Sequence, residues 1–297
     1  MSRYLVTGAS GFIGAALTRR LVKDGHEVYA LVRSEVKKGL FPDGVVVVTG
    51  DLLAIDSWVF GLPPFDAVFH LGNTARYPED NHSCEAQLRN SLACCQLFDC
   101  LKFSAEGKFV LVGTSYCAQV GRGVDGEFRG CSIYGVARAS AENILRVMAH
   151  RSGVGYNGVY LTNCFGVGDT SWRSTNFILK KFLEGVAPPL VSGEFPHDWI
   201  YIDDLVEGLV LVAAKGKKHN SYYLGNRNLR SFREIIEGVR DIIAPGLVLD
   251  FGSLEDSSRI DYSQFDLDLA SEELGFECSA PFDKSVALTA EWVKSLC

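Results

Sequence analysis

The stretch Tyr4-Leu-Val-Thr-Gly-Ala-Ser-Gly-Phe-Ile-Gly14 decides the fold of this chain. Its apolar start leads into three glycines, and an amphipathic stretch from Ala15 to Lys23 follows them. This order predicts a strand, a tight turn and a helix. Glycines in such a turn let the backbone approach a pyrophosphate, which the free N–H groups at the start of the helix favour. We therefore expect the phosphates of a dinucleotide to bind at Gly8, Ser10, Gly11, Phe12, Ile13 and Gly14.

The composition is that of a large globular protein, because 47% of the 297 residues are hydrophobic and 22% are charged. The formal net charge of −7 argues against a nucleic-acid partner. No apolar run approaches the ~20 residues that span a membrane, and the amino terminus has no signal-peptide pattern, so we expect a cytoplasmic protein without a membrane partner. The nine cysteines form no Cys-x-x-Cys motif, which predicts reduced thiols and no metal site.

Short apolar runs alternate with helical patterns over the first 160 residues. Such runs are typical of parallel strands that are covered on both faces. The expected strands are 4–6, 27–32, 45–49, 67–71, 109–113 and 158–162, and the expected helices are 11–24, 84–103 and 132–151. Repeated strand–helix units predict an α/β fold with a doubly wound parallel Rossmann sheet and right-handed crossovers.

The regular alternation breaks after Asn163, where glycines and prolines become frequent. Further helices are expected at 174–185, 203–215, 231–243 and 283–295. We expect a dinucleotide-binding Rossmann domain over 1–165, to which 197–225 returns, and a smaller interleaved α/β substrate lobe over 166–297.

The end of the second expected strand bears on the choice of cofactor. Folds that prefer NAD usually place an acidic residue here, on the ribose hydroxyls, but this chain has Arg33. An arginine forms charge-assisted hydrogen bonds with a 2′-phosphate, and Lys37 or Lys38 would add charge. NADP(H) is therefore favoured and NAD(H) remains possible, since Arg33 is alternatively an exposed loop residue and Glu35 lies close by.

Asp51 and Leu52 follow the third expected strand directly. A carboxylate at this place can accept a hydrogen bond from the adenine amino group. The alternative is an aspartate that caps a helix or stabilises a turn.

Tyr134 and Arg138 are four residues apart on an expected helix, so their side chains share one face. Tyrosine has a reference pKa of about 10, and a neighbouring cation favours the phenolate that acid–base catalysis needs. Thr114 and Ser115, at the end of the fifth expected strand, would donate to the same substrate oxygen. The alternative is a surface pair of Tyr134 and Arg138 without a catalytic role.

Taken together, these motifs resemble an extended short-chain dehydrogenase/reductase of the NAD-dependent epimerase/dehydratase type, and the resemblance covers nearly the whole chain. The matching segments are Thr7–Gly14, Asp51-Leu52, His70–Ala75, Asn90, Asn163–Gly168 and Asp198–Asp204. The resemblance implies a catalytic set in which Thr114, with Ser115 as second choice, supplies the hydroxyl and Tyr134 is the acid–base group. It also implies that Leu71 and Asn90 line the cofactor site.

Two departures from the family pattern affect the expected site. Arg138 stands in the place of a lysine, and a guanidinium keeps the positive charge but does not release a proton. His197 stands where many relatives have an arginine that reaches the substrate diphosphate. The resemblance implies a substrate site of Thr74, Asn163, His197 and Arg259, in which Arg259 carries the charge. We expect His197 to assist when protonated, below its ordinary pKa of about 6.5.

The resemblance and the pattern of Arg33 together favour NADPH-dependent reduction of a keto group, on a nucleotide-linked 4-keto (deoxy)sugar. The segments 251–276 and 290–292 resemble those of deoxysugar 4-ketoreductases and epimerases. One alternative is an NAD-dependent epimerase or dehydratase of sugar nucleotides. Another is a catalytically weak dinucleotide-binding sensor or scaffold. The resemblance also implies a homodimer formed through the helices 84–103 and 132–151.

Overall fold

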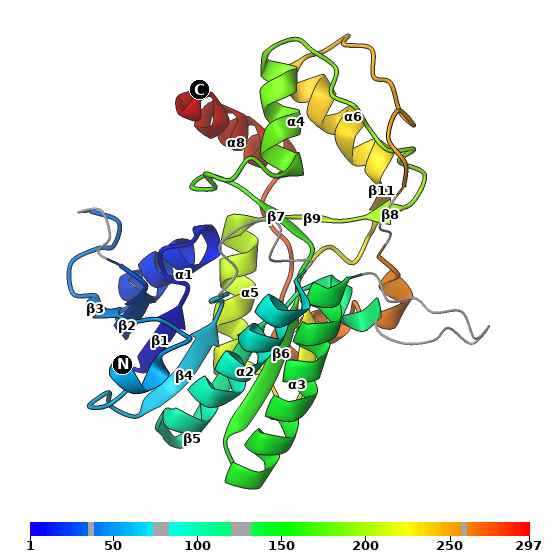
Figure 1. Cartoon of the computed structure of the whole chain (residues 1–297). Coiled ribbons are helices and arrows are strands. Elements are labelled where there is room, and N and C mark those ends of the chain that lie inside the picture. The colour runs from blue at the N-terminus through cyan, green and yellow to red at the C-terminus, as the bar shows by residue number, and fades with distance from the viewer. Residues whose placement is uncertain (35–38, 74–82, 120–131, 257–259) are drawn as a thin grey trace.

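Seven parallel strands form the central sheet, in the order β10-β6-β5-β4-β1-β2-β3 (Figure 1). The computed structural model describes residues 1–34, 39–73, 83–119, 132–256 and 260–297. The strands are β1 (Arg3–Thr7), β2 (Glu27–Val32), β3 (Val46–Thr49), β4 (Phe65–His70), β5 (Phe103–Val112), β6 (Gly155–Tyr160) and β10 (Ser221–Tyr223). The parallel α/β fold expected from the sequence is confirmed.

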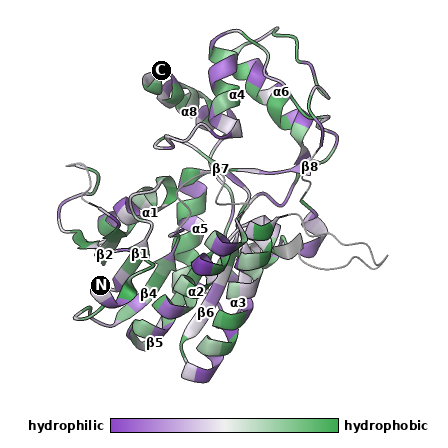
Figure 2. Ribbon diagram, viewed as in Figure 1, coloured by the Kyte–Doolittle hydropathy of each residue, from purple (hydrophilic) through white to green (hydrophobic). Residues whose placement is uncertain are grey.

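Helices cover both faces of this sheet. Successive side chains of a strand point to opposite faces, and because both faces are apolar, each is buried in its own cluster under a pair of helices. Leu5 belongs to the cluster under α2 (Cys84–Cys100) and α3 (Ile133–Ser152). Val6 belongs to the cluster under α1 (Phe12–Lys23) and α5 (Ile202–Lys215). The helices of each pair also contact one another. Figure 2 shows hydrophobic and hydrophilic residues alternating along α2 and α3, as expected for helices with one buried face.

A smaller lobe lies beyond the carboxyl ends of the strands (Figure 1). Its helices α4 (Ser174–Leu183), α6 (Phe232–Ile243) and α8 (Phe282–Leu296) pack against one another. The short strands are β7 (Asn163–Phe165), β8 (Pro196–His197), β9 (Trp199–Tyr201) and β11 (Arg230–Ser231); β7 pairs with β9, and β8 with β11. A short helix, α7 (Leu269–Leu274), and the 3-10 turns η1 (Ile55–Ser57), η3 (Ser115–Gln119) and η4 (Tyr262–Gln264) complete the elements of the described chain.

Several expected boundaries are wrong. The helix expected over 84–103 ends at Cys100, and β5 already begins at Phe103, six residues before the expected strand. The strand expected over 158–162 lies at Gly155–Tyr160. β10 and α7 were not expected, since three and six residues are too few to show a hydrophobic period. Among the described residues, none of the helices has the length and apolarity to cross a membrane.

Candidate active site

The glycine turn joins β1 to α1 in the conformation expected for a phosphate-binding loop. Gly8 has φ of +66°, a region that favours glycine, and its carbonyl oxygen accepts a hydrogen bond of 3.0 Å from Gly11 N. A Cβ atom at Gly14 would overlap that same carbonyl oxygen. No side chain caps α1, and no acidic residue stands in its first turn, so the N–H groups of that turn suit an anion such as a phosphate. Ser10 and Gly11 are exposed at this helix start.

The peptide of Gly72, just beyond β4, connects the glycine turn to α3. Gly72 N donates to Thr7 Oγ1 at 3.0 Å, and Thr7 Oγ1 lies 2.8 Å from Nδ1 of His70. Gly72 O accepts from Nη2 of Arg138 at 3.4 Å. A Cβ atom at Gly8 would lie 2.9 Å from Gly72 N, so the two backbones are in close contact. One peptide therefore bridges the ends of β1 and β4 and the buried guanidinium.

The Arg138 guanidinium is charged and buried, with 5% of its surface exposed. Burial alone lowers the pKa of Arg138, but the neighbouring Tyr134 and Cys94 raise it above its ordinary value. Nε of Arg138 has no hydrogen-bond partner among the described residues. A buried N–H without a partner is costly, and a ribose hydroxyl would satisfy it. The site therefore fits a dinucleotide at this arginine as well as at the glycine turn.

Tyr134 lies beside Arg138 on the first turns of α3. The Cζ atom of Arg138 is 5.9 Å from the centre of the Tyr134 ring. Ser132 caps the helix by accepting from Gly135 N at 2.9 Å. A Cβ atom at Gly135 would lie 2.7 Å from the carbonyl oxygen of Tyr116, so the start of α3 packs directly against η3. This contact brings the end of β5 and the tyrosine together.

The two candidate hydroxyl groups differ in accessibility. Ser115 is buried, and its Oγ has no hydrogen-bond partner in the described part of the chain. Thr114 is half-buried, and its Oγ1 accepts from Tyr116 N at 3.4 Å. A substrate hydroxyl reaches Thr114 more readily than Ser115, which agrees with Thr114 as first choice.

The expected adenine and ribose contacts lie along the same edge of the sheet. Asp51 Oδ1 accepts from Leu53 N at 2.9 Å, so at least one oxygen of Asp51 stabilises the turn, as the alternative interpretation had it. Leu52 is buried, and its Cδ1 would be 2.7 Å from a Cβ atom at Gly72. Arg33 is exposed.

Two further residues expected at the cofactor lie next to the Gly72 peptide. Leu71 is half-buried. Asn90 of α2 is buried and donates to Asn73 Oδ1 at 2.5 Å. This hydrogen bond ties α2 to the segment that follows β4.

The expectation that His197 is a protonated partner of the substrate is wrong. Burial lowers the pKa of His197 to about 4, so the ring is neutral near pH 7. Nδ2 of Asn163 lies 2.6 Å from Nε2 of His197, which suits an amide donating to a neutral imidazole. Phe195 and Phe232 stack on each other, and both lie edge-on to the ring. The two expected substrate residues Asn163 and His197 are thus together, but they carry no charge.

Thr74, Arg259 and the residues Glu35, Lys37 and Lys38 lie outside the described residues. Within the described ranges, no group of three or more His, Cys, Asp or Glu side chains is arranged to hold a metal ion. Sequence reasoning did not single out the Gly72 peptide, its partner Thr7 or the His70 ring that contacts Thr7. The signal for them was present, since all three residues lie within the motifs Thr7–Gly14 and His70–Ala75.

Acid should destabilise the protein already below pH 6.5. Burial, and then the charge of Arg138, lower the pKa of His70 to about 3, and burial lowers that of His197 to about 4. Below pH 6.5 these two histidines become protonated in the unfolded chain but stay neutral in the folded protein. Each therefore lowers the free energy of unfolding by about 1.4 kcal/mol per pH unit until the pH reaches its folded pKa. Urea unfolding at intervals from pH 7 to pH 5 measures this slope.

The variant His197→Gln should show a shallower slope, because it removes one of the two titrating rings. A free energy of unfolding that stays constant between pH 7 and pH 5 would contradict the buried neutral state of both histidines.

The fold and this site define an NAD(P)-dependent oxidoreductase of the extended short-chain dehydrogenase/reductase type. The profile of the NAD dependent epimerase/dehydratase family matches residues 4–225. The chain belongs to the NAD-dependent epimerase/dehydratase family.

Similar proteins of known sequence or structure agree with this assignment. The chain is 23% identical to UDP-glucuronate 4-epimerase 3 of Arabidopsis thaliana over 97% of its own length and 75% of the relative's. It superimposes with a TM-score of 0.82 on UDP-N-acetylglucosamine 4-epimerase of Methanobrevibacter ruminantium M1 in complex with UDP-N-acetylmuramic acid, at 20% identity, covering 100% of this chain and 99% of that one. The TM-score is 0.81 with Bordetella bronchiseptica WbmF in complex with NADH, at 22% identity over 99% and 92% of the two chains.

Proposed function

We propose that this protein is a sugar-nucleotide epimerase or dehydratase that uses a nicotinamide dinucleotide held at the glycine turn. The observation that carries the proposal is the buried Arg138, which has an N–H free for a ribose, stands beside Tyr134 and is bonded to the Gly72 peptide. That peptide contacts the glycine turn at Gly8, so the expected cofactor site and the expected acid–base group are joined through Gly72 and Arg138.

The side chains divide the chemistry between them. The nicotinamide, when bound, accepts and returns a hydride. Tyr134 takes the proton from the substrate hydroxyl at the carbon that is oxidised, and returns it when that carbon is reduced. Thr114 donates a hydrogen bond that orients the same oxygen. Arg138 holds the ribose and stabilises the phenolate by its permanent charge, with no proton passing through it.

Epimerisation or dehydration takes precedence over the keto reduction that the sequence first suggested. The family description names both activities, and the two relatives described above by their activity are epimerases. Their substrates support a nucleotide-linked sugar as the substrate of this chain. The alternative of a sensor or scaffold rested on the arginine at position 138, where the family has a lysine. It is less favoured because the Arg138 guanidinium keeps its charge next to Tyr134.

Retention of the cofactor tests this proposal. An epimerase or dehydratase regenerates its cofactor in each cycle, so purified protein should release NAD(P) on heat or acid denaturation. A protein that purifies without cofactor and oxidises free NADPH stoichiometrically with a keto sugar would instead be a reductase.

The preference for NADP(H) stays a prediction, and Arg33 is the residue that tests it. Its exposed side chain stands at the end of β2, where a charge-assisted pair with a 2′-phosphate is worth about 1.5–3 kcal/mol, or roughly tenfold to a hundredfold in affinity. Arg33→Asp should abolish or reverse the preference in fluorescence titrations with NADPH and NADH. Equal dissociation constants of the wild type for the two would refute it.

We also propose a homodimer through α2 and α3. These helices pack side by side and leave an apolar surface of Leu88, Leu92, Ile144 and Val147, each at least half exposed. Apolar side chains gathered in this way mark interaction sites. Sedimentation velocity of the wild type reports the mass.

A further inference from the structure

The Trp58 side chain packs against the segment that follows β3, where the adenine of the cofactor is expected. Trp58 is buried, with 9% of its surface exposed, and its indole Nε1 donates to the carbonyl oxygen of Asp51 at 2.9 Å. The same oxygen accepts from Ala54 N at 3.0 Å, just before the turn η1 that leads to Trp58. Two donors therefore fix the peptide that follows Asp51.

The indole ring of Trp58 also lies against the backbone of Gly50. A Cβ atom at Gly50 would overlap Cδ1 and Cγ of Trp58, so a side chain at position 50 and an indole at position 58 exclude each other. Gly50 N donates to Val32 O at 2.8 Å, and Val32 is the last residue of β2, next to Arg33. The ring thus helps to fix the ends of β2 and β3 relative to each other.

The segment that Trp58 holds carries the carboxylate of Asp51. Asp51 Oδ1 accepts from Leu53 N at 2.9 Å, so the side chain is attached to the same turn as the peptide below the indole. The buried Leu52, between these two residues, reaches Gly72, because its Cδ1 would lie 2.7 Å from a Cβ atom there. The position of the carboxylate relative to the rest of the cofactor site therefore depends on where Trp58 holds this turn.

We propose that Trp58 is a positioning residue that makes the cofactor site selective for adenine. It fixes Asp51 where the carboxylate accepts a hydrogen bond from the amino group of the base. Such a bond needs a donor–acceptor distance of about 2.7–3.2 Å, so a small displacement of the turn loses it. The proposal rests on the proposed function in so far as the site holds a nicotinamide dinucleotide. The indole acts through Asp51 and Gly50, since its N–H and its ring contact these residues.

Exchange of the bound cofactor measures this selectivity. The two dinucleotides to compare are the adenine form and an analogue with unsubstituted purine, which lacks only the amino group. We expect the wild type to bind the adenine form about tenfold to a hundredfold more tightly, as for one hydrogen bond to a charged acceptor. Trp58→Phe keeps an aromatic ring and removes the N–H donor, so it should reduce this ratio to less than about threefold, through weaker binding of the adenine form.

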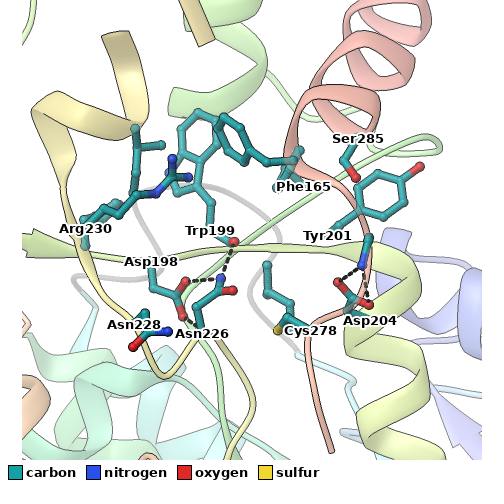
Figure 3. A pocket seen from close by; sticks show the side chains of 15 residues that line it. Phe165, Asp198, Trp199, Tyr201, Asp204, Asn226, Asn228, Arg230, Cys278 and Ser285 are labelled. Carbon is teal, nitrogen blue, oxygen red and sulfur yellow. Dashed lines mark hydrogen bonds between the residues drawn. The ribbon is translucent and has the colours of Figure 1, made fainter. Parts of the chain in front are cut away.

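Gly50→Ala disturbs the same contact from the other side. The added methyl group displaces the indole or the end of β3 and removes no hydrogen-bonding group, so the ratio should fall here as well. Trp199→Phe is the matched control, because the indole N–H of Trp199 has no hydrogen-bond partner in the described ranges. Figure 3 shows Trp199 in the wall of a cavity whose lining includes neither Asp51 nor Trp58. The control should keep the ratio of the wild type.

The ratio distinguishes positioning from a purely structural role. If Trp58 only stabilised the fold, Trp58→Phe would lower the melting temperature and weaken both dinucleotides equally, so an unchanged ratio overturns the proposal. A wild type that binds both forms equally well overturns it too, because the amino group is then not recognised. If Trp58→Phe does not fold, the ratio of Gly50→Ala decides in the same way.

Turnover separates this proposal from the proposed function. Conversion of a sugar nucleotide by a wild type that does not distinguish the two bases would leave the proposed function standing without this role of Trp58. A wild type that binds neither dinucleotide would refute both.

Discussion

Replacing Tyr134 by phenylalanine should lower turnover by about 10²- to 10⁴-fold, the usual contribution of a positioned acid–base group. The change removes one hydroxyl and keeps the ring that lies 5.9 Å from the Arg138 Cζ atom. Cofactor affinity should hardly change, because the contact between the ring and the guanidinium remains. Initial rates at saturating substrate, together with a fluorescence titration of the cofactor, measure both quantities.

Tyr29→Phe is the control for this substitution. The Tyr29 hydroxyl bonds to Glu27, and both residues belong to β2, so this variant should retain full turnover. A loss of less than about twofold in Tyr134→Phe would mean that another group moves the proton.

Replacing Arg138 by methionine should damage both turnover and cofactor binding. Methionine fills a similar volume but removes the buried charge, the free Nε and the hydrogen bond to Gly72 O. We expect cofactor affinity to fall about tenfold to a hundredfold, as for the loss of one charge-assisted contact. Turnover should fall further, since the phenolate of Tyr134 loses the cation beside it.

Arg138→Lys separates charge from shape at this position. It should keep much of the cofactor affinity and the turnover, because the positive charge remains on the same face of α3. Arg146→Met is a control on the same helix, since Arg146 binds Glu142 and Ser221 away from the Gly72 peptide. Equal turnover of Arg138→Met and the wild type would refute the role of the guanidinium.

The fold and the first contacts of the site were predictable from the sequence because they depend on local patterns. A few residues are enough to recognise the glycine turn, each apolar strand and the spacing of Tyr134 and Arg138. The Gly72 peptide shows the limit of such patterns. Its partners Thr7 and Arg138 lie 65 and 66 residues away, so their convergence depends on the order of strands in the sheet.

The error at His197 has a different cause. A histidine in a polar motif suggests an exposed group with its ordinary pKa, but burial among Phe195 and Phe232 sets its charge.

The most direct test of the central claim is NMR of the purified protein with a panel of UDP- and dTDP-linked sugars and no added reductant. The proposal predicts that at least one sugar nucleotide is converted to an epimer or a dehydrated 4-keto product, while the total of bound cofactor stays constant. Tyr134→Phe should give no detectable conversion over the same time. If the protein retains its cofactor but converts no sugar nucleotide of the panel, or acts only when NADPH is consumed, the account of an epimerase or dehydratase is contradicted.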